Sequence, residues 1–184
     1  MGKKILAIVL TLLVIGGAAG GFFFRRWYRE KALTDKEKWT TVTHAEYTVT
    51  LPKTMQEIQD FSFADNSMTP LTAYSTGKAG FSVGKLDYTG GYERLKDLDV
   101  EGILEKMKFG GSTLLPEKTA SGGYYVTYSQ NITENGTSKL YYFIEGIYKG
   151  KNAMYSATAV CGAEDLSELK PYMIEWIDSF RTTN

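Results

Sequence analysis

The chain opens with an uninterrupted run of twenty uncharged, mostly apolar residues. The run extends from Ile5 to Phe24 and follows Lys3 and Lys4. At a rise of about 1.5 Å per residue, a helix of this length spans roughly 30 Å, which is the thickness of a bilayer's hydrocarbon core. The pattern therefore predicts one N-terminal transmembrane helix, within a signal-anchor segment that covers residues 1–28.

Residues at the end of the run favour an anchor that stays attached to the protein. Arg25, Arg26 and Trp27 follow the last phenylalanine, and basic and aromatic side chains are typical of a membrane interface. Small residues at 17–20 also resemble a cleavage site, so a cleaved signal peptide and a secreted domain are the alternative. The residues expected to contact lipid or its interface are Ile5, Leu13, Phe22, Phe24, Arg25, Arg26 and Trp27.

The charges on the two sides of the run give conflicting signals for its orientation. Four basic residues follow the run and two precede it, so counting positive charges favours a cytosolic domain. A short tail with two lysines before an apolar core is, however, the usual form of an export signal, and long domains are translocated largely regardless of charge. We therefore expect a single-pass protein of the cell membrane whose large domain is extracytoplasmic.

Beyond the anchor, charged residues give way to alternating apolar and polar positions. Residues 29–44 are rich in charge and are predicted to form a stalk outside the core, whereas residues 45–184 are predicted to form the folded domain. An Asn-Gly pair at 135–136 separates two strand-like runs and predicts a tight hairpin. Strands are predicted at residues 47–51, 71–75, 79–88, 124–133, 137–148 and 152–161.

Two helices are predicted between and after these strands. Asp99 is a candidate N-cap of the first, and the glycine pair at 110–111 is expected to end it. The second helix covers residues 165–180, where Pro171 must lie in the first turn or kink the helix. Residues 53–70 are predicted to form a short helix or a loop. Together these elements predict an α+β domain in which helices pack on an antiparallel β-sheet.

The balance of charge differs between the two parts of the chain. Residues 1–38 hold eight Lys or Arg and three Asp or Glu, for a net charge of +5, whereas residues 39–184 hold thirteen and eighteen, for −5. Nucleic-acid binding needs clustered basic residues to neutralise phosphates, so an acidic domain excludes a nucleic-acid partner. The basic residues at 25–31 are instead expected to lie beside lipid headgroups of the bilayer.

Patterns that would indicate catalysis or metal binding are sparse. His44 is the only histidine and Cys161 the only cysteine, so neither a zinc tetrad nor a histidine-based nucleophile pair is expected. Cys161 is expected to be a small buried thiol. Asp97, Asp99 and Glu101 resemble the start of a calcium loop, but a lysine occupies the twelfth position, and a helix cap explains them better. No catalytic residue, cofactor or metal site is therefore predicted.

Glu145 and the tyrosines leave two further interpretations open. Glu145 interrupts an apolar strand, and we expect it to face outward at the sheet edge, although a buried carboxylate is the alternative. If a second carboxylate lay about 5–10 Å away in a cleft, the domain would be a hydrolase of envelope polysaccharide. The thirteen tyrosines indicate either cross-strand packing or a partner-binding sheet face.

The order of these features resembles the PsbP/Mog-like family, including its DcrB-like bacterial members. An export segment is followed by a strand at 47–52 (YTVTLP), an aromatic meander and a final helix that ends at 176–180 (WIDSF). The resemblance covers about residues 45–182 and implies an α/β/α sandwich with a mostly non-catalytic role, in which members bind a protein complex or assist envelope processes. No functional residue of the family maps onto a matching motif here.

These observations lead to one expected function and two alternatives. We expect a membrane-anchored, extracytoplasmic, non-enzymatic binding or accessory module of the bacterial cell envelope that contacts a protein partner. The alternatives are a carboxylate-based envelope hydrolase and an anchored domain that faces the cytosol.

Overall fold

The computed structural model describes residues 31–59, 61–62, 68–106, 108–109, 112–134 and 136–183. The predicted anchor, residues 1–28, lies outside these ranges. Within them, no helix has both the length and the apolar character needed to cross a bilayer.

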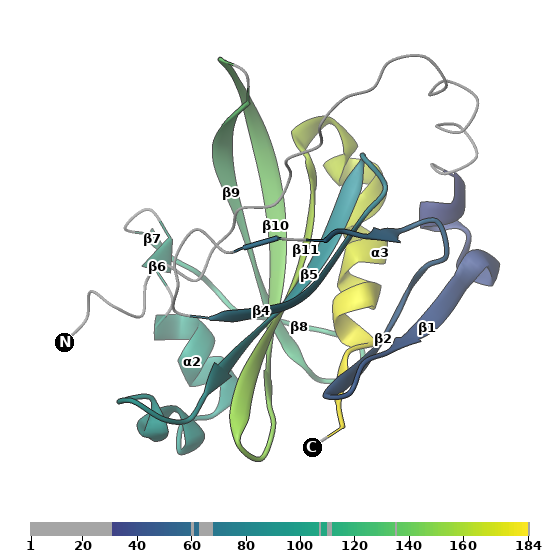
Figure 1. Ribbon diagram of the computed structural model, residues 1–184. Coiled ribbons are helices and arrows are strands. Elements are labelled where there is room, and N and C mark those ends of the chain that lie inside the picture. Colours follow the sequence, from purple (N-terminus) through teal and green to yellow (C-terminus); the bar gives the residue numbers. More distant parts are fainter. Residues whose placement is uncertain are drawn as a thin grey trace.

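A seven-stranded antiparallel sheet forms the centre of the domain in the described residues (Figure 1). Its strands lie in the order β3 (Gln56–Glu57), β4 (Thr69–Ser75), β5 (Ala79–Asp87), β11 (Ala153–Gly162), β10 (Thr137–Lys149), β9 (Tyr124–Glu134) and β8 (Glu117–Lys118). A smaller sheet has the order β1 (Trp39–Thr43), β2 (Tyr47–Pro52) and β12 (Arg181–Thr182), and a separate pair is formed by β6 (Lys108–Phe109) and β7 (Ser112–Thr113).

Helices lie on both faces of the large sheet. The long helix α3 (Leu166–Asp178) and the smaller sheet cover one face, and α2 (Val100–Lys106) lies on the other (Figure 1). The described residues also include three short 3-10 helices: η1 (Lys36–Lys38), η2 (Glu93–Lys96) and η3 (Ala163–Asp165). The arrangement confirms the predicted α+β class, with helices packed on an antiparallel sheet.

Each sheet face has its own apolar core. The small residues of β11 let α3 pack closely, and they share one buried cluster with the inner side of α3: Ala153, Ala157, Ala159, Cys161, Leu169, Met173, Trp176 and Ile177. The cluster on the opposite face combines α2 with alternate strand residues: Ile103, Leu104, Val126, Phe143, Ile147, Met154 and Val160. Because successive side chains of a strand point to opposite faces of the sheet, alternate residues of each strand belong to different cores.

The predicted strands and the predicted hairpin are confirmed, with small shifts at their ends. In the hairpin, Glu134 of β9 lies opposite Thr137 of β10, which leaves a two-residue turn. Gly136 in that turn has φ of +78°, the left-handed conformation that such turns require. The segment predicted as a helix or loop at 53–70 includes the short strand β3 and the start of β4.

The folded domain begins earlier than residue 45, because part of the predicted stalk belongs to it. Strand β1 pairs with β2 along its whole length, and Ala32 and Leu33 are buried. The ring of Trp39 lies edge-on to the ring of Trp176 in α3, with centroids 6.1 Å apart. Threonines fill most of β1, so the strand lacks an apolar alternation that would have marked it in the sequence.

Helix α2 begins as predicted and ends earlier than predicted. The Asp99 carboxylate accepts a hydrogen bond from the backbone N–H of Gly102 at 2.7 Å, which caps the first turn. The helix ends at Lys106, and β6 begins at Lys108, two residues before the glycine pair that was expected to end the helix. In α3, Pro171 lies inside the helix, beyond its first turn.

The substitution Asp99→Ala should lower the free energy of unfolding by about 1 kcal/mol, because the backbone N–H of Gly102 in the first turn of α2 loses its hydrogen-bond acceptor. Urea denaturation measures this loss. Asp97→Ala is the matched control, because Asp97 is exposed and should change stability by less than about 0.5 kcal/mol. A melting temperature that rises with added calcium in the wild type alone would instead support a calcium loop.

Candidate functional site

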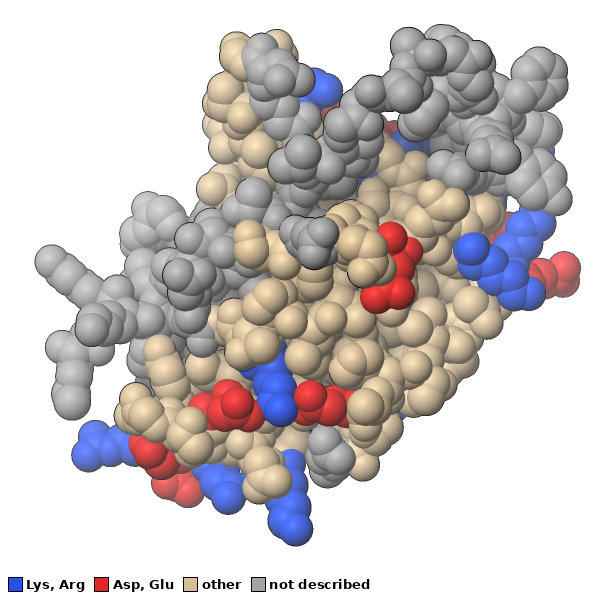
Figure 2. Space-filling view, viewed as in Figure 1, with Lys and Arg blue, Asp and Glu red and all other residues tan. Residues whose placement is uncertain are grey.

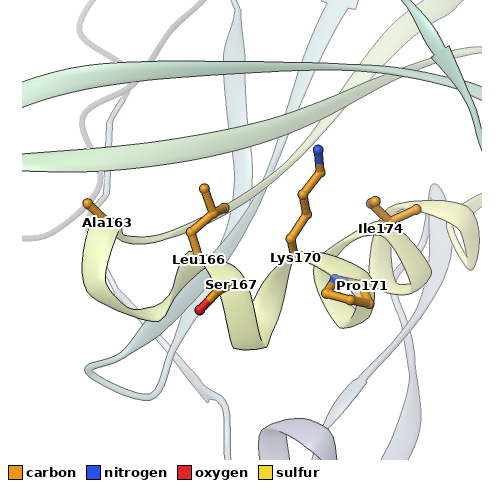
Figure 3. Close-up of a pocket in the computed structure, with 6 residues that line it drawn as sticks. All are labelled: Ala163, Leu166, Ser167, Lys170, Pro171 and Ile174. Atoms are coloured by element: carbon orange, nitrogen blue, oxygen red, sulfur yellow. The ribbon is translucent and has the colours of Figure 1, made fainter.

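A hollow of about 520 Å³ lies along one side of α3 (Figure 3). Leu166, Lys170 and Ile174 are spaced four residues apart, so they lie above one another on the same side of the helix. Figure 3 shows these three side chains projecting to the same side of the helix. We call this hollow the α3 groove; its lining residues are Ala163, Leu166, Ser167, Lys170, Pro171 and Ile174.

The sequence of α3 explains why this side of the helix stays partly open. Leu169, Met173 and Trp176 form the buried stripe that fixes the helix to the sheet. Leu166 and Ile174 lie at the margin of that stripe, where they pack against the core only in part. The helix therefore presents half-buried apolar carbon at an accessible surface.

The chemistry of the α3 groove suits binding. Leu166, Ile174 and Pro171 supply apolar surface, and the ammonium group of Lys170 supplies a positive charge among them. Ser167 adds an exposed hydroxyl. Such a surface fits a peptide or protein segment that carries apolar side chains next to a carboxylate.

A second polar feature lies inside the domain, at the middle of β10. Glu145 is only 1% exposed, so the expectation that it faces outward at the sheet edge is wrong. Its carboxylate accepts hydrogen bonds from the Tyr128 hydroxyl at 3.1 Å and from the Ser156 hydroxyl at 2.5 Å. The physical reason is that β10 is a central strand, with Phe143 and Ile147 on the same covered face.

Burial dominates the electrostatics of this carboxylate. It raises the pKa of Glu145 to about 7, and the hydrogen bonds from Ser156 and Tyr128 oppose that rise only in part. Burial and the nearby carboxylate together raise the pKa of Tyr128. In the next strands, Thr158 lies opposite Glu145 and Ser82 lies opposite Thr158, which gives a row of small hydroxyl side chains across the buried face.

A hydrolase would need a second carboxylate beside Glu145. The hydrogen-bond partners found for Glu145 in the described part of the chain are the hydroxyls of Tyr128 and Ser156. No group of three or more His, Cys, Asp or Glu residues that could hold a metal ion occurs among the described residues. Because the Glu145 carboxylate is buried, its ionisation bears on the stability of the core.

The remaining candidate residues of the sequence have structural surroundings. His44 accepts a hydrogen bond from the Glu46 backbone N–H at 3.3 Å, and its ring stacks on Tyr47 with centroids 4.9 Å apart. Cys161 is buried, as predicted, and its burial raises the pKa of the thiol to about 12. Such a thiol is a poor nucleophile at neutral pH.

The surface charges are mixed in sign. Figure 2 shows basic and acidic side chains interspersed on the face in view, among the residues that are coloured. One polar group joins the bend before β2 to strands β5 and β11: the Glu46 carboxylate pairs with Lys85 at 2.8 Å and accepts a hydrogen bond from the Tyr155 hydroxyl at 2.7 Å. These contacts lower the pKa of Glu46, with the bond from Lys85 as the largest cause.

The predicted membrane-contact residues lie outside the described residues, so their roles stay predictions; they are Ile5, Leu13, Phe22, Phe24, Arg25, Arg26 and Trp27. The α3 groove was not predicted. Its signal in the sequence is that Leu166, Lys170 and Ile174 are four residues apart, beside the main apolar stripe of the helix.

Comparisons with known proteins give similarity only to solved structures. No protein-family model matches this chain, and no curated protein matches it. A structure from Bacteroides thetaiotaomicron is 12% identical with a TM-score of 0.46; the match covers 80% of this chain and 48% of that one, so this chain spans about half its length.

Two further solved structures have similar scores. Cyanobacterial PsbP from Synechocystis is 9% identical with a TM-score of 0.42, over 90% of this chain and 98% of that one. A mutant of Mog1 is 9% identical with a TM-score of 0.44, over 79% of this chain and 96% of that one. The solved structures with a similar fold therefore include PsbP and Mog1. They carry no argument about function, and membership of the PsbP/Mog-like family stays a prediction.

Proposed function

We propose that this protein is a membrane-anchored, extracytoplasmic and non-enzymatic binding module of the bacterial cell envelope, which contacts a protein partner through the α3 groove. The observation that carries the proposal is the groove itself, in which half-buried Leu166 and Ile174 flank the ammonium group of Lys170. Apolar surface of this kind loses contact with water when a partner covers it, which favours association.

The apolar opening of the chain supports the membrane part of the proposal. A run of twenty uncharged residues before the domain suits an anchor in lipid, and it would concentrate the groove at the membrane surface. The finer assignment, to a DcrB-like member of the PsbP/Mog-like family, belongs to the same proposal.

Site-specific photo-cross-linking in the bacterium that produces the protein tests the groove. A photoreactive residue at Ser167, which lines the groove, should give one discrete protein adduct. The matched control is the same residue at Glu168, which is exposed and adjacent but does not line the groove. Leu166→Glu should reduce the adduct at least tenfold, whereas Leu115→Glu should not, because Leu115 is an exposed leucine outside the groove.

Three outcomes would contradict the proposal. One is equal adducts from positions 167 and 168, and another is no adduct from either position. The third concerns compartment: added protease should digest the domain in intact spheroplasts, and a domain that resists digestion until the cells are lysed would place it in the cytosol.

A further inference from the structure

One long edge of the large sheet has no partner strand among the described residues. Strand β9 pairs with β10 from Tyr125 to Glu134, but on its other side β8 meets only Tyr124 and Tyr125. Figure 1 shows the ribbon of β9 and β10 extending well beyond the neighbouring strands. In an antiparallel ladder, alternate residues direct their N–H and C=O groups away from the paired neighbour, so residues 126–133 of β9 present such groups outward.

This edge lacks the features that usually prevent strand pairing. Sheet edges are commonly protected by lysine, proline, bulges or very short strands. The opposite edge of the sheet has them: β3 is two residues long, and β4 carries Pro70 next to a register shift. Residues 126–133 (VTYSQNIT) contain no charge, proline or glycine, and their register with β10 is continuous.

We infer that β9 pairs antiparallel with β9 of a second copy of this chain, about a two-fold axis at Gln130. A two-fold axis makes the contact isologous, so each pair occurs twice. This register places Ser129 opposite Asn131, Tyr128 opposite Ile132 and Thr127 opposite Thr133. Polar pairs, aromatic–β-branched pairs and Thr–Thr pairs are among the combinations that stabilise neighbouring strands, and no like charges meet.

The exposure of these residues agrees with such a contact. Ser129, Asn131 and Thr133 are exposed, so a second strand can approach them without displacing core residues. Gln130 itself is half-buried, and a two-fold axis places the second Gln130 opposite it on the neighbouring strand. One strand pair buries less area than a standard interface, so we expect a weak, concentration-dependent dimer.

Charge substitution at the edge tests the inference on the full chain in detergent, with the mass of the complex measured by light scattering. Ser129→Lys with Asn131→Lys places lysines opposite each other across the axis and should weaken the dimer at least tenfold. Ser138→Lys is the matched control, because Ser138 is exposed on β10, across the hairpin from the outer edge of β9. Mixing the double-lysine variant with Ser129→Asp/Asn131→Asp should restore a mixed dimer.

A cysteine at the axis tests the register. Residues that face each other across a non-hydrogen-bonded antiparallel pair have Cα atoms about 4.5 Å apart, within reach of a disulfide. Gln130→Cys should therefore form a covalent dimer on mild oxidation, and Ser138→Cys should not. The buried Cys161 does not compete. A wild type that is monomeric at every concentration, or a dimer that the double-lysine variant leaves unchanged while circular dichroism shows it folded, would overturn the inference.

Discussion

The free energy of unfolding should fall by about 3 kcal/mol as the pH rises from about 4.5 to 7, because of Glu145 alone. Burial raises the pKa of this carboxyl to about 7 in the folded protein, whereas its usual value is 4.5. Between these two values the folded state binds more protons than the unfolded state, so stability decreases with pH. The full stability is present below pH 4.5 and is lost as the pH passes 7.

Urea denaturation at a series of pH values, with wild type and Glu145→Gln, measures this effect. Glutamine keeps a side-chain oxygen that accepts from Tyr128 and Ser156 but does not ionise, so the variant should lack the decrease and exceed the wild type in stability at pH 8. Equal slopes for the two proteins between pH 4.5 and 7 would show that Glu145 does not titrate in this way.

Glu46→Gln is the matched control with the opposite sign. Lys85 lowers the pKa of Glu46, so this carboxylate contributes stability above the usual pKa and loses it as the pH falls. Its glutamine variant should therefore be less stable than the wild type at pH 7 and should keep the decrease with pH that Glu145 causes. The two variants therefore distinguish the effect of a buried carboxylate on the pH dependence of stability from the effect of an ion-paired carboxylate in the same domain.

Features that depend on neighbouring residues could be predicted from the sequence. The Asn-Gly turn between β9 and β10 and the Asp99 cap of α2 both depend on residues a few positions apart. The small residues of β11 are likewise visible within one strand, and they mark the face on which α3 packs closely. Local chemistry was sufficient in these cases.

Features that depend on distant residues could not be predicted in the same way. A carboxylate in an alternating strand is usually a sign of the solvent face, and only the hydroxyl from β9 and the hydroxyl from β11 make the burial of Glu145 tolerable. Strand β1 could not be predicted for a similar reason. Its pairing with β2 holds it in the sheet, and its threonines give no alternation of apolar and polar residues.

Trp176→Ala should lower the free energy of unfolding by about 4 kcal/mol, the largest loss that we expect from a single substitution. Trp176 has no exposed surface and is the largest fully buried side chain among the described residues. It lies where α3, β1 and the large sheet meet, and removing the indole leaves a cavity that these three elements cannot close without moving. Urea denaturation followed by far-UV circular dichroism measures the loss.

Tyr172→Ala is the matched control for this cavity, because it removes another aromatic ring from the same helix. Tyr172 also lies edge-on to Trp39, with centroids 6.2 Å apart, but it is only half-buried. Water can replace its ring, so its loss should cost less than half as much. Trp176→Phe should cost least, because the indole N–H has no partner among the described residues and phenylalanine removes that buried donor. Equal losses from Trp176→Ala and Tyr172→Ala would mean that α3 is held mainly by its outer contacts, and that the α3 groove lies on a loosely attached helix.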